Sequence, residues 1–148
     1  MSAAVTEPET AYVAQLVEDW APRWFVDLHT GDFGLIHPWS CAVPPQAMPA
    51  ADVQAHLALG GIYANVIAAF GGPLPTIGKG QGFTVAGGTS HDWVYSRHLA
   101  PRSLAPRALA FSIEWSLEQV PLWHDMNGLV AQVSAGLVAM ILAVAQGA

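Results

Sequence analysis

The sequence predicts an α/β domain whose mixed, mainly parallel sheet is flanked by helices. Strand-like and helix-like segments alternate along the chain, which is typical of this architecture. The length of 148 residues is that of one domain large enough to bury a core. Because 53% of the residues are hydrophobic and only 11% are charged, we expect either a rich core or an apolar surface that a partner covers. We therefore expect residues 1–148 to form a single domain.

The first predicted element is a helix over residues 6–22, where apolar residues recur at helical spacing. Thr6 precedes Glu9 by three residues, which is the spacing of a capping box at the start of a helix. Pro22 predicts the end of the helix.

Two extended segments follow this helix. Residues 23–29 predict a short strand buried on both faces, and residues 34–39 predict a second extended segment that Pro38 closes. The first strand ends on His29. Because functional residues of open α/β sheets lie at the carboxyl ends of strands, His29 is a candidate metal ligand.

The middle of the chain predicts one helix between two loops. Residues 41–49 contain three prolines and residues 71–82 are rich in glycine and proline, so both predict loops. Residues 50–70 predict a helix with one apolar stripe. His56 falls outside that stripe, and we expect it to face solvent.

The last third of the chain predicts a strand and a helix. Residues 107–115 predict a strand in which Ser112 and Glu114 share one face. Residues 126–148 predict the final helix. Its glycines, alanines and glutamines make it only moderately hydrophobic, so we expect it to be buried in the domain rather than to cross a membrane.

Composition excludes several classes of function. The net charge is −6 without a basic patch, so we expect no nucleic-acid partner. The single cysteine, Cys41, cannot form an intrachain disulfide or a zinc knuckle. Residues 1–10 lack the basic and apolar regions of a signal peptide, and the cellular compartment stays unassigned. We expect no membrane partner.

Glu114 is a second candidate functional residue. A carboxylate at the end of an apolar strand is costly unless it is paired or functional, and burial raises its pKa toward the range of a general base. The alternative is a glutamate on the solvent face of an edge strand, and the pattern leaves both interpretations open. Among the six histidines we favour His29 as a ligand, whereas His37, which precedes a proline, is interpreted as structural.

A third feature is the glycine-rich segment of residues 82–95, whose glycines allow a loop to approach a ligand closely. Asp92 in this segment is expected to cap a turn or a short helix. Periodicity alone predicts only a loop here.

Four motifs occur in a fixed order along the chain. They are EPET at residues 7–10, DLHTG and HPW within residues 27–39, GGTSHDWVY at residues 87–95 and FSIEW at residues 111–115. This order resembles the zinc metallocarboxypeptidases, most closely the branch of carboxypeptidases E, N and D, and covers nearly the whole chain. The resemblance implies a partial carboxypeptidase-like fold, the C-terminal half of a catalytic domain, and zinc-dependent hydrolysis of the C-terminal peptide bond.

The resemblance implies a role for each residue that matches a family motif. His29 matches the family's C-terminal zinc-binding histidine, and Glu114 matches the general base that activates the zinc-bound water. Phe83 lies where the family has a substrate-covering tyrosine if one residue before Asp92 is an insertion; otherwise the position falls on Thr84. In both alignments the phenolic hydroxyl is absent.

Two further residues match positions of the family's specificity pocket. Ser40 falls where the basic-residue-specific members have an aspartate that holds a C-terminal Arg or Lys, which puts a preference for basic residues in doubt. His91 falls on a position that lines the pocket in relatives, and an imidazole there would favour acidic or polar end groups. The implied substrates are peptide C-termini.

The motifs that complete the family's site are missing from this sequence. The family's first two zinc ligands come from a His-x-x-Glu motif, and its substrate clamps contain arginine; neither is found here. Because a catalytic zinc takes three protein ligands, this chain supplies one of them. We therefore expect no peptidase activity from the chain alone and an N-terminal half of the same enzyme as its partner.

Two alternatives remain open at this point. The first is a zinc-dependent deacylase of N-acyl amino acids that resembles the desuccinylases and aspartoacylases, which often contain DLHT at this point. The second is a non-catalytic fragment or binding module that retains part of the fold.

Overall fold

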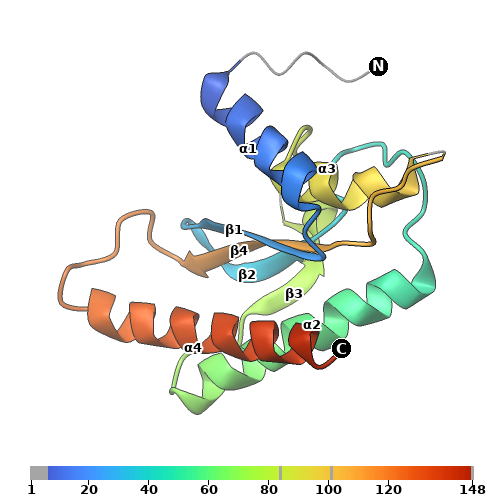
Figure 1. Cartoon of the computed structure of the whole chain (residues 1–148). Helices are drawn as coiled ribbons and strands as arrows, with labels where there is room; N and C mark the ends of the chain where they lie inside the picture. Colours follow the sequence, from blue (N-terminus) through green and yellow to red (C-terminus); the bar gives the residue numbers. More distant parts are fainter. Residues whose placement is uncertain (1–6, 84, 101, 148) are drawn as a thin grey trace.

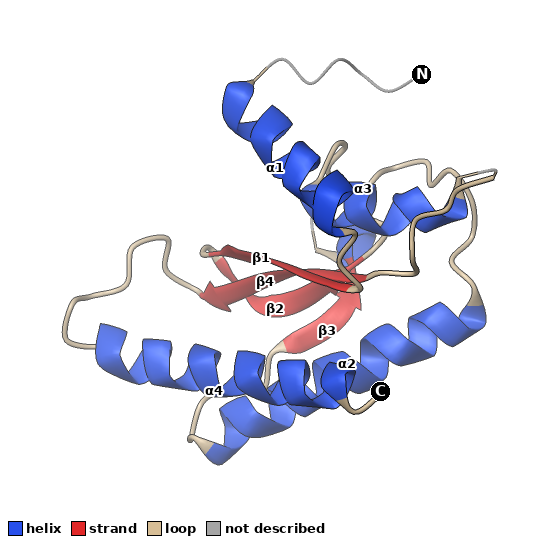
Figure 2. Ribbon diagram, in the orientation of Figure 1, coloured by secondary structure: helices blue, strands red, loops and turns tan. Residues whose placement is uncertain are grey.

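A four-stranded sheet lies between two layers of helices in the computed structural model, which describes residues 7–83, 85–100 and 102–147 (Figures 1 and 2). The elements are α1 (Pro8–Trp20), β1 (Trp24–His29), β2 (Asp32–His37), α2 (Ala50–Ala69), β3 (Thr76–Lys79), α3 (Ser90–Ser96), β4 (Leu109–Ser116) and α4 (Met126–Ala145), with short 3-10 turns η1 (Gly80–Gly82) and η2 (Arg97–Leu99). Helices α1 and α3 lie on one side of the sheet, and α2 and α4 lie on the other. The predicted α/β class is confirmed.

The strand order is β1-β4-β2-β3. β1 pairs with β4 and β2 pairs with β3 in parallel, whereas β2 and β4 are antiparallel, so the sheet is mixed and mainly parallel as predicted. The expectation that β1 is buried on both faces is wrong. β1 is an edge strand, and its last two residues, Leu28 and His29, are exposed.

Two hydrophobic cores lie on the two faces of the sheet. The core under α2 and α4 contains Leu35, Leu59, Tyr63, Ile67, Leu109, Phe111, Ile113 and Met140. The core under α1 and α3 contains Val17, Trp39, Val94, Tyr95, Ala108 and Ala110. Phe111 and Ile113 therefore face α2 and α4. Ser112 and Glu114 share the opposite face, as predicted, and the structure shows that this face lies on the α3 side.

The expected loop over residues 71–82 contains a strand. Thr76–Lys79 form β3, which pairs in parallel with β2 from Gly34 to His37. The flanking glycines and prolines predicted a loop correctly at both ends of this segment. Pairing with β2 orders the four residues between them, and a strand this short gives no periodic signal of its own.

Helix α1 begins at Pro8, and the residue at its N-cap is Glu7. The expected capping residue, Thr6, lies outside the described residues. Val17 is buried in the core under α1 and α3, whereas Val13 and Trp20 from the same predicted stripe are exposed. The helix therefore contributes little to the core.

Helix α4 is less buried than predicted. Where it packs against α2, a Cβ at Gly136 would lie 2.5 Å from the ring of Tyr63, so the two helices approach closely there. Only Gly136 and Met140 of α4 are buried, and its outer face exposes Val130 and Ile141. In length and composition α4 meets the requirements for crossing a membrane, with only 11% of its apolar window buried.

His56 is fully buried, with 0% of its surface exposed, and the expectation that it faces solvent is wrong. Its Nδ1 lies 2.7 Å from the carbonyl oxygen of Asp52, and its Nε2 accepts the backbone N–H of Ala110 at 3.2 Å. A neutral imidazole that carries its proton on Nδ1 satisfies both contacts. Burial lowers the pKa of His56 to about 4.

This pKa predicts how folding stability depends on pH. The pKa of His56 is about 4 in the folded chain, against 6.5 for a solvated histidine, so the unfolded state binds more protons between these values. The contribution of His56 is therefore complete above about pH 6.5, and it decreases by on the order of 3 kcal/mol as the pH falls toward 4. We expect His56→Gln to remove this part of the pH dependence, measured as urea unfolding free energies at pH 7.5 and 4.5.

A matched control is His124→Gln, because the side chain of His124 is 75% exposed. This variant should keep the pH dependence of the parent chain. Equal pH dependence in the His56 and His124 variants would show that the burial of His56 does not cause the loss of stability at low pH.

Candidate functional site

The candidate site begins with one pair of residues on neighbouring parallel strands. His29 at the end of β1 lies opposite Glu114 in β4, so both side chains leave the sheet on the side of α3. The atom Oε2 of Glu114 is buried and forms no hydrogen bond within the described residues. Burial raises the pKa of Glu114, and this is the direction that favours a general base. Of the two interpretations of Glu114, the structure supports the inward-facing one.

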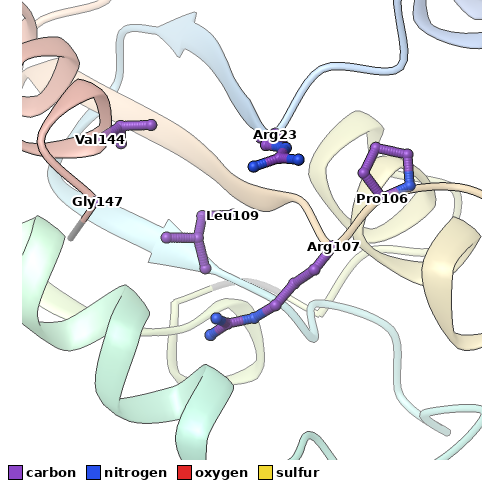
Figure 3. Close-up of a pocket in the computed structure, with 6 residues that line it drawn as sticks. All are labelled: Arg23, Pro106, Arg107, Leu109, Val144 and Gly147. Atoms are coloured by element: carbon purple, nitrogen blue, oxygen red, sulfur yellow. The ribbon is translucent and has the colours of Figure 1, made fainter.

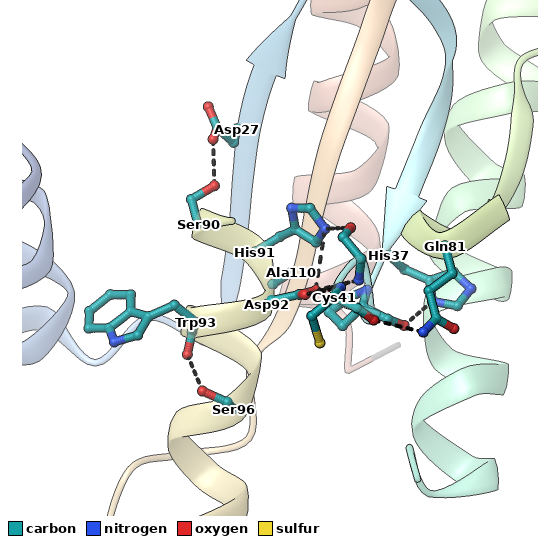
Figure 4. Close-up of polar contacts among 12 residues, drawn as sticks. Asp27, His37, Cys41, Gln81, Ser90, His91, Asp92, Trp93, Ser96 and Ala110 are labelled. Atoms are coloured by element: carbon teal, nitrogen blue, oxygen red, sulfur yellow. Dashed lines mark hydrogen bonds and ion pairs between the residues drawn. The ribbon is translucent and has the colours of Figure 1, made fainter. Parts of the chain in front are cut away.

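A second pair lies two residues earlier on the same face, where Asp27 of β1 is opposite Ser112 of β4. The carboxylate oxygen Oδ2 of Asp27 accepts the hydroxyl proton of Ser90 in α3 (Figure 4). The same oxygen lies 3.1 Å from Nε2 of His29. Asp27 therefore links the start of α3 to the imidazole at the end of β1.

Asp27, His29 and Ser112 of these pairs border a cleft of about 220 Å³, which Glu114 does not line. Its lining residues are Asp27, His29, Thr89, Ser90, His91 and Ser112. The first residues of α3 form its opposite wall, since both Ser90 and His91 belong to that helix. A space of this size accommodates one side chain rather than a drug-sized molecule.

His91 is held by the loop that follows β2. Its Nε2 lies 2.8 Å from Oγ of Ser40 and 3.5 Å from Oδ1 of Asp92. The carboxylate of Asp92 accepts the backbone N–H groups of Ser40, at 2.9 and 3.0 Å, and of Cys41, at 3.1 Å (Figure 4). The prediction that Asp92 caps this helix is wrong, because the N-cap of α3 is Thr89. Asp92 instead fixes the loop after β2 against α3.

The two residues expected in the specificity pocket, Ser40 and His91, contact each other, but only one of them lines the cleft. His91 lines the cleft, whereas Ser40 is buried behind it and is not a lining residue. His37, interpreted from the sequence as structural, is also buried, and its Nδ1 lies 2.7 Å from the carbonyl oxygen of Pro38.

Phe83 lies on the same face of the sheet as Glu114. A Cβ at Gly34 would lie 2.5 Å from the Phe83 ring, and Gly34 is the residue of β2 opposite Glu114. Its expected role as a substrate cover stays a prediction. The alternative position, Thr84, lies outside the described residues.

A metal ion does not fit the residues of this chain by themselves. Within residues 7–83, 85–100 and 102–147, no three His, Cys, Asp or Glu side chains come together to hold one. Zinc in a catalytic site takes three protein ligands. The described residues therefore do not complete a zinc site, and the role of His29 as a zinc ligand stays a prediction.

The overall architecture matches solved structures, although no protein-family model and no curated protein matches the sequence. Bovine thrombin-activatable fibrinolysis inhibitor, solved in complex with tick carboxypeptidase inhibitor, aligns over 99% of this chain with a TM-score of 0.75 and 13% identity. A crystal structure of thrombin-activatable fibrinolysis inhibitor (TAFI) aligns over 95%, with a TM-score of 0.69 and 16% identity. The fold is carboxypeptidase-like.

This chain is shorter than the structures that it matches. It spans 48% of the first and 35% of the second. At these identities the likeness concerns the fold, and it does not distinguish the branch of carboxypeptidases E, N and D.

Sequence reasoning missed four residues of the cleft, which are Asp27, Thr89, Ser90 and Ser112. Asp27 precedes His29 by two residues, so the two-residue period of a strand could have placed both on one face. Ser112 shares a face with Glu114 by the same rule. Thr89 and Ser90 reach the cleft only because α3 packs over the sheet, and no local pattern predicts that contact.

A wider hollow of about 430 Å³ lies at the opposite end of β1 and β4 (Figure 3). It is lined by Arg23, Pro106, Arg107, Leu109, Val144 and Gly147. The Nε of Arg107 lies 2.6 Å from Oδ1 of Asp52, so this guanidinium is already paired. The candidate site is the smaller cleft, where the strands end.

Removing the carboxylate that holds this loop should destabilise the protein. Asp92→Ala leaves the backbone N–H groups of Ser40 and Cys41 without their acceptor, which costs about 3 kcal/mol of unfolding free energy. Asp92→Asn keeps one acceptor oxygen and should lose less. Urea unfolding measures both variants.

The control is Glu118→Ala, because Glu118 is exposed in the loop after β4. It should change the unfolding free energy by less than about 0.5 kcal/mol. A loss of that small size in Asp92→Ala would show that the loop does not depend on this carboxylate.

Proposed function

We propose that this chain is the C-terminal half of a carboxypeptidase-like hydrolase of the carboxypeptidase E, N and D branch, which acts on peptide C-termini after a second polypeptide completes its site. The observation that carries the proposal is the His29–Glu114 pair at the ends of two neighbouring parallel strands. The four sequence motifs support the branch, and the carboxypeptidase-like fold supports the type of enzyme.

Glu114 is the proton acceptor in this proposal. Its Oε2 has no hydrogen-bond partner among the described residues, and burial raises its pKa. It takes a proton from the attacking water and gives it to the amine that leaves the peptide bond. His29 contributes one imidazole ligand to a zinc site whose other two ligands come from the second polypeptide.

The sheet has a free edge for the completing polypeptide. Edge strand β1 pairs with β4 on one side only. Next to its end is an apolar cleft of about 230 Å³, lined by Leu28, Trp115, Val130, Val133, Ser134 and Leu137. An added strand along β1 would satisfy the backbone groups of the edge, and its apolar side chains would cover this cleft. The chain spans 48% of the length of the bovine structure.

The experiment compares the chain alone with the chain co-expressed with the product of the coding region that precedes it. The chain alone should bind no stoichiometric zinc and release no C-terminal residue. The completed protein should bind zinc stoichiometrically and release C-terminal residues. Blocked peptides and N-acyl amino acids are assayed in parallel, because preference for the latter would favour the deacylase alternative. Stoichiometric, tight zinc in the isolated chain would overturn the proposal.

Glu114→Gln tests the proton acceptor in the completed protein. Turnover should fall by about 10²–10⁴-fold while zinc content is retained, because only the proton acceptor is removed. Glu118→Gln is the matched control, since Glu118 is exposed in the loop after β4. Unchanged turnover in the Glu114 variant would show that Glu114 is not the proton acceptor.

Leu28→Lys tests the docking edge. Leu28 is 46% exposed on β1, and burying a leucine contributes about 1.5–3 kcal/mol, so we expect at least about tenfold weaker association with the completing polypeptide. Circular dichroism checks the fold, and Leu104→Lys, at a position that is 100% exposed, is the control. Equal association of the two variants would place the interface elsewhere.

A further inference from the structure

The wider hollow, at the start of β1 and β4, is lined by two arginines and by no carboxylate. Its lining residues are Arg23, Pro106, Arg107, Leu109, Val144 and Gly147, around a volume of about 430 Å³ (Figure 3). Small-molecule sites typically have volumes of about 300–1,000 Å³. In a chain with a net charge of −6 and five basic residues, two guanidiniums at one hollow indicate a site for an anion.

This hollow lies far from the candidate site. Arg23 directly precedes β1, whereas His29 is the last residue of that strand. Six steps of extended chain span about 20 Å, so the hollow and the cleft that His29 lines are at opposite ends of β1. A ligand in the hollow therefore does not occupy the place of the peptide bond in the proposed function.

Arg107 is held in position by a buried carboxylate. Its Nε lies 2.6 Å from Oδ1 of Asp52, and its side chain extends toward α2 (Figure 3). The other oxygen of Asp52 accepts the hydroxyl of Tyr95 at 2.6 Å. Nη2 of Arg107 makes one longer contact, 3.4 Å from the carbonyl oxygen of Ala51. Because a guanidinium has five N–H donors, Arg107 keeps donors for a ligand, and half of its side chain is exposed.

Arg23 supplies a positive charge that no neighbouring carboxylate compensates. None of the ion pairs among the described residues involves Arg23. Its carbonyl oxygen accepts the backbone N–H of Leu109 at 2.9 Å, which fixes the start of β1 beside the start of β4. Because Asp52 neutralises Arg107, the positive charge of Arg23 is in excess at the hollow.

A further N–H donor without a partner lies next to these residues. Trp24 follows Arg23 and is the register partner of Leu109, and both side chains belong to the core under α2 and α4. Nε1 of Trp24 is buried and has no hydrogen-bond partner within the described residues. Since buried N–H groups in folded proteins are nearly always paired, this donor agrees with a hydrogen-bond acceptor bound nearby.

We propose that the hollow binds an organic monocarboxylate with a short apolar chain. Arg23 and Arg107 donate hydrogen bonds to the carboxylate oxygens. The apolar chain contacts Pro106, Leu109 and Val144, which form the aliphatic part of the lining. One positive charge in excess matches a single carboxylate better than a phosphate dianion. The site goes beyond the proposed function, because it needs neither zinc nor the completing polypeptide.

The alternative is that the two arginines only offset the negative end of α4. Val144 lies in the last turn of this helix and Gly147 just follows it, where carbonyl groups carry partial negative charge. Part of that charge is already compensated, because the N–H groups of Gln146 and Gly147 donate to carbonyls of the last turn. Arginines that serve only the helix end predict no preference for a charged ligand.

The test titrates the isolated chain with three probes at pH 7.5 and follows the amide chemical shifts by NMR. Hexanoate has the charge and the chain, hexanamide has the chain alone, and inorganic phosphate has the charge alone. We expect hexanoate to bind at least about fivefold more tightly than either of the others, because only hexanoate uses both the arginines and the aliphatic wall. The shifts should centre on Leu109, Val144 and Gly147.

Three outcomes of this titration would overturn the inference. Equal binding of hexanoate and hexanamide would support the helix-end alternative. Phosphate bound as tightly as hexanoate would show that the aliphatic wall contributes nothing. Shifts centred on Asp27 and His29 would place the ligand in the smaller cleft instead.

Arg23→Gln should weaken hexanoate binding at least about fivefold and leave hexanamide binding unchanged, because it removes the charge in excess. Lys79→Gln is the matched control, since it removes one positive charge from the exposed end of β3, which β4 and β2 separate from β1. Arg23→Lys keeps the charge without the planar fork and should lose less affinity than Arg23→Gln.

Arg107 is left unchanged in this test, because its removal would also leave Asp52 buried without its partner. Circular dichroism checks that each variant folds. Equal losses of hexanoate affinity in Arg23→Gln and Lys79→Gln would reduce the effect to net charge and refute the site. Unchanged affinity in a folded Arg23→Gln would refute it as well.

Discussion

The parallel pairing of β1 with β4 is the constraint on which the candidate site depends. It aligns Asp27 with Ser112 and His29 with Glu114, so that four polar side chains share one face. A slip of β1 by one residue would turn its side chains to the opposite face. Burial of Phe111 in the core under α2 and α4 fixes the facing of β4. Packing on the apolar face of the sheet therefore determines where the chemistry occurs on the other.

The second determinant is the attachment of α3 to the loop after β2. A buried carboxylate is costly unless hydrogen bonds compensate for lost hydration, and Asp92 receives them from two consecutive backbone N–H groups. The same helix binds Asp27 through Ser90. Both walls of the cleft are thus fixed before any ligand arrives, which lowers the entropy lost on binding.

The sequence predicted the helices and strands whose apolar residues recur at regular spacing. The long helices, β4 and the shared face of Ser112 and Glu114 follow from the spacing of apolar residues, and the position of His29 at a strand end follows from the apolar run before it. The burial of His56 does not follow from this spacing. One of its two hydrogen bonds, to Asp52, lies within α2, but the other, from Ala110, comes from β4. The wall formed by Thr89 and Ser90 likewise depends on how α3 packs over the sheet. Tertiary contacts of this kind leave no trace in local spacing.

The free edge of β1 and the apolar outer face of α4 also bear on the colloidal behaviour of the isolated chain. An unpaired strand edge is a template for pairing with any extended polypeptide, including the edge of a second copy. The net charge of −6 gives a repulsion between copies that salt weakens. Raising the salt concentration should therefore favour association between copies of the chain.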